Sequence, residues 1–520
     1  MSRRSAGPMA LLVVLGLLAA APGWTSAGPL GSSGPAPAAT PSETVSDAPT
    51  DAPTETPTSP SPAPGTVRNA IVFLVDDMSD FACRDTARFL PKSSAWLSAR
   101  GTCFENAATA TPVCCPARAQ VQTGQLPHNN HVRTQFEAGR LDATDTVQHD
   151  LGEAGLRTYG IGKFLNGVKA SRFYGLGALD NGFEDFDFWD SYRHAPGRFA
   201  MYDDDGSARF RATGLNSAET NGALLDAALD DYLATGERFF VYSAFFAPHK
   251  QGPGTSTDSL PLPSPANARR PVPPFRFAPE ADTRDKLRLF RKLRAPRAYY
   301  QRLWNARIRS LYDVDDQMAR TFRRLEDAGV LDQTAVVFAS DNGYTDRGQV
   351  NWDGKAIPYP ASTDVPMLAW FPGRPREVVQ RGVQLVDIAP TLYDVLGVEP
   401  GHELDGRSLR SSVARRVFYG EFKQEENALV KNESGRRTGW VRSWRLLKRG
   451  PWSYVVWYHD DGRILARELY RDPQMLANLL WPGHRGARPP RGVVRSLHHE
   501  LVRLSRCRGT AEQGAPNPCP

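Results

Sequence analysis

The chain has 520 residues, an ordinary share of hydrophobic and aromatic residues, and 63 basic against 57 acidic side chains, which gives a formal charge of +6. This length can hold one large domain and a smaller one, and the composition is that of a globular protein. The basic charge suits anionic partners such as nucleic acid, anionic lipid or sulfated glycan without selecting one, and the sequence contains no internal repeat, P-loop or dinucleotide-binding glycine fingerprint.

The first 66 residues carry targeting and spacer signals rather than a folded domain. Two arginines precede an apolar run at residues 9–21 and small residues follow it, which is the pattern of a secretory signal peptide over residues 1–27. The run is short for a membrane span, so we predict a secreted, extracellular protein with no stable membrane span; an uncleaved membrane anchor is the alternative. Residues 28–66 are rich in Pro, Ser, Thr and Ala, which predicts a disordered linker because few apolar side chains are there to bury.

The main folded part is predicted to be an α/β domain over residues 67–414. Residues 70–75, 239–245 and 335–339 are continuous apolar runs, which are typical of strands buried on both faces. A helical pattern at residues 299–328 lies between two of these runs. Buried strands that alternate with amphipathic helices predict a large, mostly parallel sheet flanked by helices, in which ligands bind beyond the carboxyl ends of the strands.

Residues 415–520 are predicted to form a smaller C-terminal subdomain with an antiparallel sheet. Its residue pattern changes to short segments in which apolar and polar side chains alternate. The predicted strands are residues 417–422, 440–447 and 452–458, and the predicted helices are residues 476–480 and 493–504.

The cysteines predict at least one disulfide. Cys507 and Cys519 close a short loop that contains Gly and Pro, and secretion permits them to pair. If Cys114 is consumed chemically, five cysteines remain, so at least one of them is a free thiol or has a partner elsewhere. The pairing of the other three stays open, namely Cys83, Cys103 and Cys115.

Two pairs of polar residues follow predicted buried strands. Asp76 and Asp77 close the first strand, and Asp341 and Asn342 follow the strand at residues 335–339. Adjacent carboxylates repel each other unless a cation neutralises them, and oxygen ligands from two strand ends suit a hard cation such as calcium or magnesium. A single Asp-Asp pair is more often a turn or a helix cap, so it is the two pairs together that predict a metal site.

The motif Cys114-x-Pro116-x-Arg118 suggests a family. Here the chain resembles the type I sulfatases, in which the cysteine of this motif is oxidised to formylglycine before the protein finishes folding. The register selects Cys114, since only this cysteine has Pro two positions and Arg four positions further on. The resemblance extends over residues 68–480 and is strongest to the N-acetylglucosamine-6-sulfatase branch.

The resemblance implies an alkaline-phosphatase-like fold for the catalytic part and a set of site residues. The implied metal ion is one Ca²⁺ per subunit, and its implied ligands are Asp76, Asp77, Asp341, Asn342 and Cys114 as formylglycine. Three further segments resemble family motifs, residues 162–166, 247–249 and 354–359, and they carry Lys163, His249 and Lys355. Taken singly, such lysines are usually solvated surface charges and such a histidine is a loop residue, so their motifs support the assignment.

The resemblance also implies a mechanism. One hydroxyl of the hydrated aldehyde attacks sulfur and forms a covalent sulfate, and the other hydroxyl loses its proton, expels sulfate and restores the aldehyde. Arg118 and Lys163 are implied to steady the hydrated aldehyde. Lys355 and His249 are implied to bind sulfate, with His249 also a proton donor to the leaving alcohol. A formylglycine-generating enzyme is the implied partner during maturation.

Three functions follow as hypotheses. The first is a sulfatase that acts on sulfated carbohydrate of the glycosaminoglycan type, such as N-acetylglucosamine-6-sulfate. The second is a phosphate or phosphonate monoester hydrolase of the same superfamily, and the third is a catalytically dead secreted glycan-binding protein. Nucleic-acid binding has only the basic charge behind it, so no nucleic acid is predicted as a partner. Departures from the family pattern at Leu165, Thr345 and Pro360 concern the leaving-group alcohol rather than the core chemistry.

Overall fold

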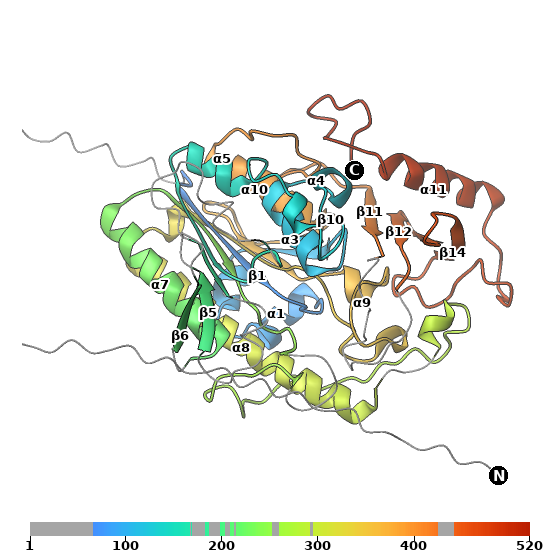
Figure 1. Cartoon of the computed structure of the whole chain (residues 1–520), viewed down its shortest axis with the longest axis horizontal. Coiled ribbons are helices and arrows are strands. Elements are labelled where there is room, and N and C mark those ends of the chain that lie inside the picture. Colours follow the sequence, from blue (N-terminus) through green and yellow to red (C-terminus); the bar gives the residue numbers. More distant parts are fainter. Residues whose placement is uncertain are drawn as a thin grey trace, which may run out of the picture. The chain divides into compact units, whose positions relative to one another are not determined.

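The computed structural model describes residues 66–166, 168, 215–251, 259–291, 295–424 and 441–520, together with the backbone of three strands between residues 183 and 212 (Figure 1). The predicted signal peptide at residues 1–27 lies outside the described residues, and so does the predicted linker at residues 28–66 except for its last residue. All described residues belong to one compact unit.

A ten-stranded sheet forms the centre of the fold, in the order β10-β2-β9-β8-β1-β7-β3-β4-β5-β6. Its neighbours β8, β1, β7, β3 and β4 are parallel, whereas β9, β5 and β6 run antiparallel to their partners. The prediction of a large, mostly parallel sheet is therefore confirmed. The strands are β1 (Asn69–Val75), β2 (Thr102–Ala108), β3 (Arg157–Gly162), β4 (Phe183–Phe186), β5 (Arg198–Tyr202), β6 (Ala208–Ala212), β7 (Phe239–Ala244), β8 (Thr334–Ser340), β9 (Met367–Trp370) and β10 (Glu377–Gln384).

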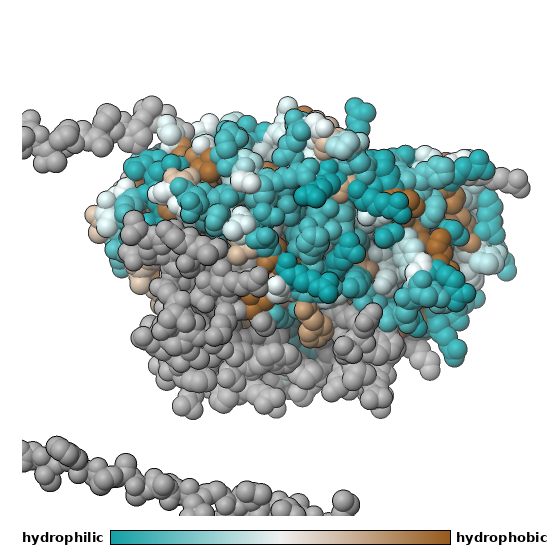
Figure 2. Space-filling model, turned by 45° about the horizontal axis from the view of Figure 1, so that its top comes forward, coloured by the Kyte–Doolittle hydropathy of each residue, from teal (hydrophilic) through white to brown (hydrophobic). Residues whose placement is uncertain are grey.

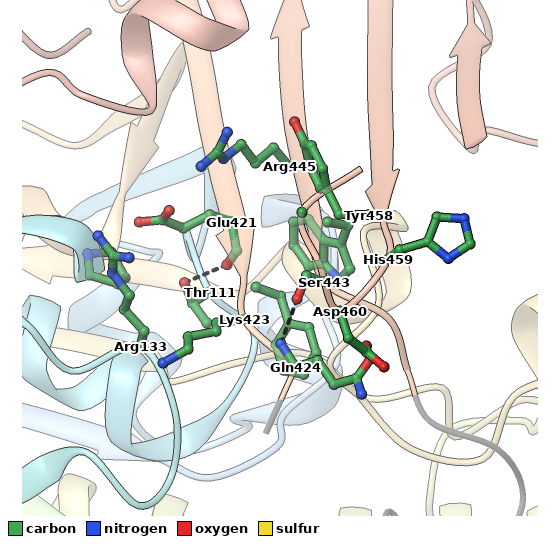
Figure 3. Close-up of a pocket in the computed structure, with 14 residues that line it drawn as sticks. Thr111, Arg133, Glu421, Lys423, Gln424, Ser443, Arg445, Tyr458, His459 and Asp460 are labelled. Atoms are coloured by element: carbon green, nitrogen blue, oxygen red, sulfur yellow. Dashed lines mark hydrogen bonds between the residues drawn. The ribbon is translucent and has the colours of Figure 1, made fainter. Parts of the chain in front are cut away.

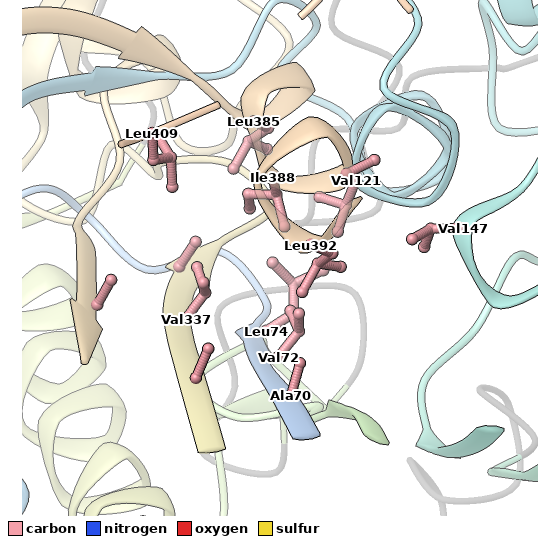
Figure 4. Packing of buried hydrophobic residues seen from close by; sticks show 14 of the residues in the cluster. Ala70, Val72, Leu74, Val121, Val147, Val337, Leu385, Ile388, Leu392 and Leu409 are labelled. Carbon is pink, nitrogen blue, oxygen red and sulfur yellow. The ribbon is translucent and has the colours of Figure 1, made fainter. Parts of the chain in front are cut away.

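Strand β1 shows why its apolar run is continuous. Ala70, Val72 and Leu74 belong to a hydrophobic cluster on one face of the sheet, and the residues between them belong to a second cluster on the other face. Successive side chains of a strand point to opposite faces, so a strand covered by helices on both sides needs an apolar residue at every position. Figure 4 shows one of these faces, where the three β1 side chains point to the side on which the covering helix carries Leu392.

Helices cover both faces of the large sheet (Figure 1). On one side lie α3 (Cys114–Thr123), α5 (Val147–Glu153) and α10 (Ile388–Leu396). On the other side lie α7 (Ser217–Thr235) and α8 (Arg297–Asp327), and α8 confirms the helix predicted at residues 299–328. The short helices are α1 (Thr86–Phe89), α2 (Ser94–Leu97), α4 (Pro127–Asn130) and α9 (Pro360–Thr363).

The C-terminal region contains a four-stranded antiparallel sheet in the order β11-β12-β13-β14, which confirms the prediction of an antiparallel sheet. One face of this sheet packs on the final helix and the other face packs on the loop that precedes α9. The strand β14 was not predicted. The elements are β11 (Val417–Phe422), β12 (Trp444–Arg449), β13 (Trp452–Tyr458), β14 (Ile464–Tyr470) and α11 (Arg491–Leu504). An isolated bridge between Gly382 and Arg415 joins this region to the large sheet, and the boundary between residues 414 and 415 stays a prediction.

The prediction of a helix at residues 476–480 is wrong, because side chains there bind the backbone in place of helical hydrogen bonds. The Asp472 carboxylate accepts hydrogen bonds from the N–H groups of Leu476 and Ala477. The Asn478 side-chain oxygen accepts from Leu480 N–H at 3.0 Å. Asp and Asn compete with helices in this way, so the segment folds as a series of turns.

Two disulfides are present, Cys83–Cys103 and the predicted Cys507–Cys519, and they leave Cys114 and Cys115 as buried free thiols. Since the first closes a loop of 20 residues, we expect Cys103→Ala to lower the free energy of unfolding by about 3 kcal/mol. Urea unfolding of the oxidised protein and of the variant, each with the second disulfide intact, measures this difference. Equal midpoints for the two proteins would show that the crosslink does not stabilise the fold.

Hydrophobic residues on the face drawn in Figure 2 are scattered among hydrophilic ones rather than gathered in one large patch. Within the described part of the chain, no helix combines the length and the apolarity that crossing a membrane requires.

Candidate functional site

Two neighbouring strand ends bring the predicted metal ligands together. Strands β1 and β8 are parallel and in register up to their last residues, so Asp76 and Asp77 lie beside Asp341 and Asn342. The Asp77 N–H donates to Asp341 Oδ1 at 3.1 Å, and the Asn342 side-chain amide donates to Asp77 Oδ1 at 2.5 Å. All four residues are buried. Asp77 has a φ of 67°, a left-handed conformation that Asp and Asn tolerate better than most residues.

Helix α3 places Cys114 at the same point. Cys114 is the first residue of the helix, which ends at Gly124 with a φ of 66°. Its sulfur lies 3.6 Å from Asp76 Oδ1, and the residue as a whole is 1 % exposed. The residue is a cysteine in this structure, so the sulfur marks the place that the oxygen atoms of a formylglycine would take. A helix N-terminus also favours anions, because its first N–H groups have no partner within the helix.

Arg118 follows Cys114 by one helical turn and therefore lies on the same side of α3. Its guanidinium is fully buried and lies 3.0 Å from Asp341 Oδ2 and 3.3 Å from Asp76 Oδ2. It also donates to the Lys163 carbonyl at 2.6 Å. In this structure Arg118 thus neutralises two carboxylates and holds the end of β3, so the part it plays toward residue 114 stays a proposal.

Both predicted lysines contact the sulfur of Cys114. Lys163 follows β3 and its ammonium nitrogen lies 3.3 Å from the sulfur, and the Lys355 nitrogen lies 2.9 Å from it. Lys163 also forms an ion pair with Asp76, and Lys355 forms one with Asp77. Two ammonium groups beside one buried sulfur can bind a group that carries negative charge.

His249 follows β7 and faces the predicted metal ligands. Its Nε2 lies 3.4 Å from Asp77 Oδ2, and its Nδ1 lies 2.6 Å from the Lys250 carbonyl. A carbonyl only accepts, so this contact keeps a proton on Nδ1 and presents Nε2 to the site. Burial lowers the pKa of His249 to about 4, against the opposing effect of Asp77.

The charges of the site compensate each other closely. Burial alone would raise the pKa of Asp76, but Lys163, His249, Lys355 and Arg118 together lower it well below its usual value. Burial and the charge of Asp76 raise the pKa of the Asp341 carboxyl to about 6. Burial, with Asp76 again, raises the pKa of the Cys114 thiol. The cationic side chains are therefore what keeps a cluster of buried carboxylates ionised.

The donor set fits a divalent cation. Asp77 Oδ2 and Asn342 Oδ1 are buried oxygen atoms without a hydrogen-bond partner, and such atoms carry a large cost unless a ligand satisfies them. One ligand atom each from Asp76, Asp77, Cys114 and His249 lie within 4.8 Å of one another. The two carboxylates of this set and the unpartnered amide oxygen of Asn342 supply the oxygen ligands that suit a hard ion such as calcium or magnesium.

The structure brings all of the residues predicted from the sequence to one site, and it adds Arg307 from α8. The Arg307 guanidinium donates to the Asp77 carbonyl, donates to the Pro248 carbonyl at 3.3 Å, and lies 3.5 Å from Asp346. It therefore ties the loop of Asp76 and Asp77 to the loop of His249. The sequence carries a signal for it, since Arg307 falls at a core position of the helix, four residues after Leu303 and four before Leu311.

We expect Arg307→Met to lower the free energy of unfolding by about 3 kcal/mol, because it leaves the buried Asp346 with Arg347, at 3.7 Å, as its ion-pair partner in the described part of the chain and frees two loop carbonyls. Urea unfolding of the variant measures the loss. Arg302→Met is the matched control, since Arg302 is exposed on the same helix and its loss should stay within about 0.5 kcal/mol. A change of the same small size in both variants would contradict the role assigned to Arg307.

The three residues at which the sequence departs from the family pattern have structural roles in a loop, in a hydrophobic cluster and at the start of a helix. The Thr345 hydroxyl donates to the carbonyls of Trp352 and Gly354 at 3.0 and 2.9 Å, and so it shapes the loop that carries Lys355. Leu165 is buried in a small hydrophobic cluster. Pro360 begins α9.

A family model described as Sulfatase matches residues 68–398. Two curated relatives are similar over much of the chain. Human N-acetylglucosamine-6-sulfatase is 28% identical over 67% of this chain and 64% of its own length. A putative extracellular sulfatase Sulf-1 homolog of Caenorhabditis elegans is 28% identical over 66% of this chain and 49% of its own length. The chain thus spans about half to two thirds of the length of these two relatives.

Solved structures share the fold. A putative sulfatase from Bacteroides fragilis has a TM-score of 0.64 at 16% identity and covers 86% of this chain and 96% of its own. A phosphonate monoester hydrolase of Agrobacterium radiobacter has a TM-score of 0.60 at 20% identity and covers 84% of this chain and 94% of its own. The expected large sheet with flanking helices and a smaller antiparallel sheet is therefore found in proteins with different named activities.

Proposed function

Because this chain belongs to the sulfatase family, we propose that it is a secreted sulfuric ester hydrolase that cleaves sulfate monoesters of sulfated sugars at residue 114. The observation that carries the proposal is the position of the Cys114 sulfur, which lies within 3.3 Å of the ammonium nitrogens of both Lys163 and Lys355. A sulfate monoester repels nucleophiles by its negative charge, and a nucleophile flanked by two cations overcomes that repulsion.

Each side chain of the site has a proposed task. Asp76, Asp77, Asp341 and Asn342 would hold a calcium ion, which supplies a Lewis acid and a template for the sulfate oxygens. Conversion of Cys114 to formylglycine would supply the nucleophile as a hydrated aldehyde. The remaining tasks belong to the side chains around it, which are Arg118, Lys163, His249 and Lys355.

The cationic side chains orient the reactants. Lys355 and Lys163 bind from two sides of residue 114, so they hold an anionic substrate and the nucleophile at one point. His249 presents Nε2 to the site while its Nδ1 keeps its proton on the Lys250 carbonyl. Nε2 therefore carries no proton in the free site, and the negative charge of a bound sulfate ester would raise the pKa of His249, so that Nε2 takes up the proton that it then passes to the departing alcohol. Arg118 keeps Asp76 and Asp341 in place and neutralised.

The substrate class rests on the relatives. Human N-acetylglucosamine-6-sulfatase and the extracellular sulfatase homolog of Caenorhabditis elegans are named for sulfated sugar chemistry or for sulfatase action outside the cell. We extend both features to this chain as part of the proposal. A phosphonate monoester hydrolase with the same fold supports a second candidate, hydrolysis of phosphate or phosphonate esters.

Mass spectrometry of the peptide that contains Cys114, taken from secreted protein, tests the proposal directly. Replacement of the thiol by an aldehyde lowers the peptide mass by about 18 Da. We expect this loss, together with a higher kcat/KM for 4-nitrophenyl sulfate than for 4-nitrophenyl phosphate. A fully alkylatable thiol at residue 114 in protein that still hydrolyses sulfate esters would overturn the proposed chemistry, and a preference for the phosphate ester would favour the second candidate.

A further inference from the structure

A cavity lies between the small sheet and the segment that leads into α3 (Figure 3). Its volume is about 340 Å³, which falls in the size range of small-molecule sites. Charged and aromatic side chains from several segments line it, among them Arg133, Glu421, Lys423, Arg445, Tyr458 and Asp460.

The walls of this cavity are tied to the catalytic residues. Thr111 lines it three residues before Cys114, and its hydroxyl donates to the Glu421 carbonyl at 2.6 Å. Trp444 lines it as well, and its indole N–H donates at 2.9 Å to the carbonyl of Ala356, the residue after Lys355. The cavity wall is therefore connected to the segments that carry residue 114 and Lys355.

The carboxylates at this cavity are already paired. Glu421 lies 2.7 Å from His128 Nδ1, and Asp460 lies 2.6 Å from the Arg442 guanidinium. Lys423 is likewise engaged, because its ammonium nitrogen lies 2.8 Å from Glu137. These three pairs leave the cavity close to neutral before its two remaining arginines are considered.

Arg133 and Arg445 supply the excess positive charge. Neither forms an ion pair within the part of the chain that the structure describes. Figure 3 shows their guanidinium groups on the side of the cavity where Glu421 lies. Burial would raise the pKa of Glu421, but His128, Arg133 and Arg445 lower it, so both arginines act on this part of the cavity. The Arg445 guanidinium also stacks on Tyr458 at 5.2 Å, which fixes its position.

We propose that this cavity binds a second anionic sugar residue of a sulfated glycan chain through Arg133 and Arg445, next to the residue that loses its sulfate. Arginine is suited to this task, since its planar fork makes paired hydrogen bonds to a sulfate or carboxylate group. The inference rests on the proposed sulfatase function. Its consequence is that the protein distinguishes a sulfated oligosaccharide from a small sulfate ester by contacts outside the reaction centre.

Binding of a heparin-derived tetrasaccharide to the full chain tests the inference, with Cys114→Ala present throughout so that the probe is not consumed. We expect Arg133→Gln and Arg445→Gln each to raise Kd about tenfold, the loss of one charge-assisted contact. Arg84→Gln is the matched control, because the Arg84 side chain is 83% exposed and pairs only at 3.9 Å with its neighbour Asp85. It should leave Kd within about twofold.

The outcomes distinguish a failure of the cavity assignment from a failure of the proposed sulfatase function. Arg133→Lys and Arg445→Lys, which keep the charge, should lie between the parent and the glutamine variants, and thermal unfolding verifies that each variant is folded. If the parent does not bind the tetrasaccharide, or if both glutamine variants bind it as the parent does, the inference is overturned. A protein that hydrolyses no sulfate ester but loses tetrasaccharide binding with these variants would instead contradict the proposed function and leave the cavity assignment standing.

Discussion

Replacing Cys114 with alanine is expected to lower kcat for sulfate-ester hydrolysis by about 10⁴-fold or more, the scale of losing a covalent nucleophile. Alanine can neither be oxidised to formylglycine nor attack sulfur. The fold should survive, because Lys163 and Lys355 keep their ion pairs with Asp76 and Asp77 when the sulfur is gone. Initial rates with 4-nitrophenyl sulfate, beside a thermal unfolding curve for each protein, measure both effects.

Cys115 provides the matched control. It is the next residue in α3, it is buried, and its thiol is free as that of Cys114 is. Its sulfur accepts a hydrogen bond from the Asn166 N–H at 3.1 Å, and the residue packs in a small hydrophobic cluster. We expect Cys115→Ala to keep kcat within about tenfold of the parent while lowering stability by about 1–2 kcal/mol. Equal activity losses in both alanine variants would contradict the assignment of Cys114.

A serine at position 114 separates attack from release. A serine hydroxyl can attack sulfur, but it has no second hydroxyl on the same carbon with which to expel sulfate. Cys114→Ser is therefore expected to release at most one alcohol per protein molecule and then stop. Sustained turnover by this variant would show that the aldehyde is not needed.

The fold was predictable from the sequence where burial on two faces leaves a simple pattern. Strands β1, β7 and β8 are continuous apolar runs because helices cover both sides of the sheet. The antiparallel edge strand β14 was not predicted. Its first half is partly exposed, charged residues interrupt its apolar ones, and it therefore has no long apolar run. The helix expected at residues 476–480 failed because Asp472 and Asn478 bind the backbone, a local competition that hydrophobic spacing does not report.

The site was predictable to the extent that its residues follow strand ends or belong to a motif. Asp76 and Asp341 end neighbouring parallel strands, so their meeting follows from the fold. Lys163, His249 and Lys355 were assigned by resemblance, because nothing in their spacing says that they meet. Sequence reasoning also left the pairing of Cys83 with Cys103 open, since their proximity depends on how the chain after β1 packs beside β2.

Removal of the proposed cation is expected to lower kcat/KM for 4-nitrophenyl sulfate by about 10²-fold or more. Three carboxylates, Asp76, Asp77 and Asp341, are matched by three cations, Arg118, Lys163 and Lys355. Without a metal ion the net charge of the site is therefore close to zero. A divalent ion adds two positive charges to the place where an anionic substrate must bind. Calcium should restore activity after treatment with a chelator, and it should raise the unfolding free energy by about 2.7 kcal/mol at a hundredfold excess over Kd.

Asp77→Asn tests the same site without a chelator. Asparagine accepts the left-handed conformation that residue 77 adopts with a φ of 67°, so the loop should keep its shape while one charged ligand is lost. We expect this variant to bind calcium at least about tenfold more weakly and to show a smaller calcium-dependent rise in unfolding temperature than the parent. Asp282→Asn, at an exposed carboxylate that pairs with Arg284, is the control and should respond to calcium as the parent does. If chelation and desalting change neither the activity nor the unfolding temperature of the parent protein, an exchangeable metal ion at the predicted metal site is ruled out. The unpaired oxygen atoms of the site would then need another ligand.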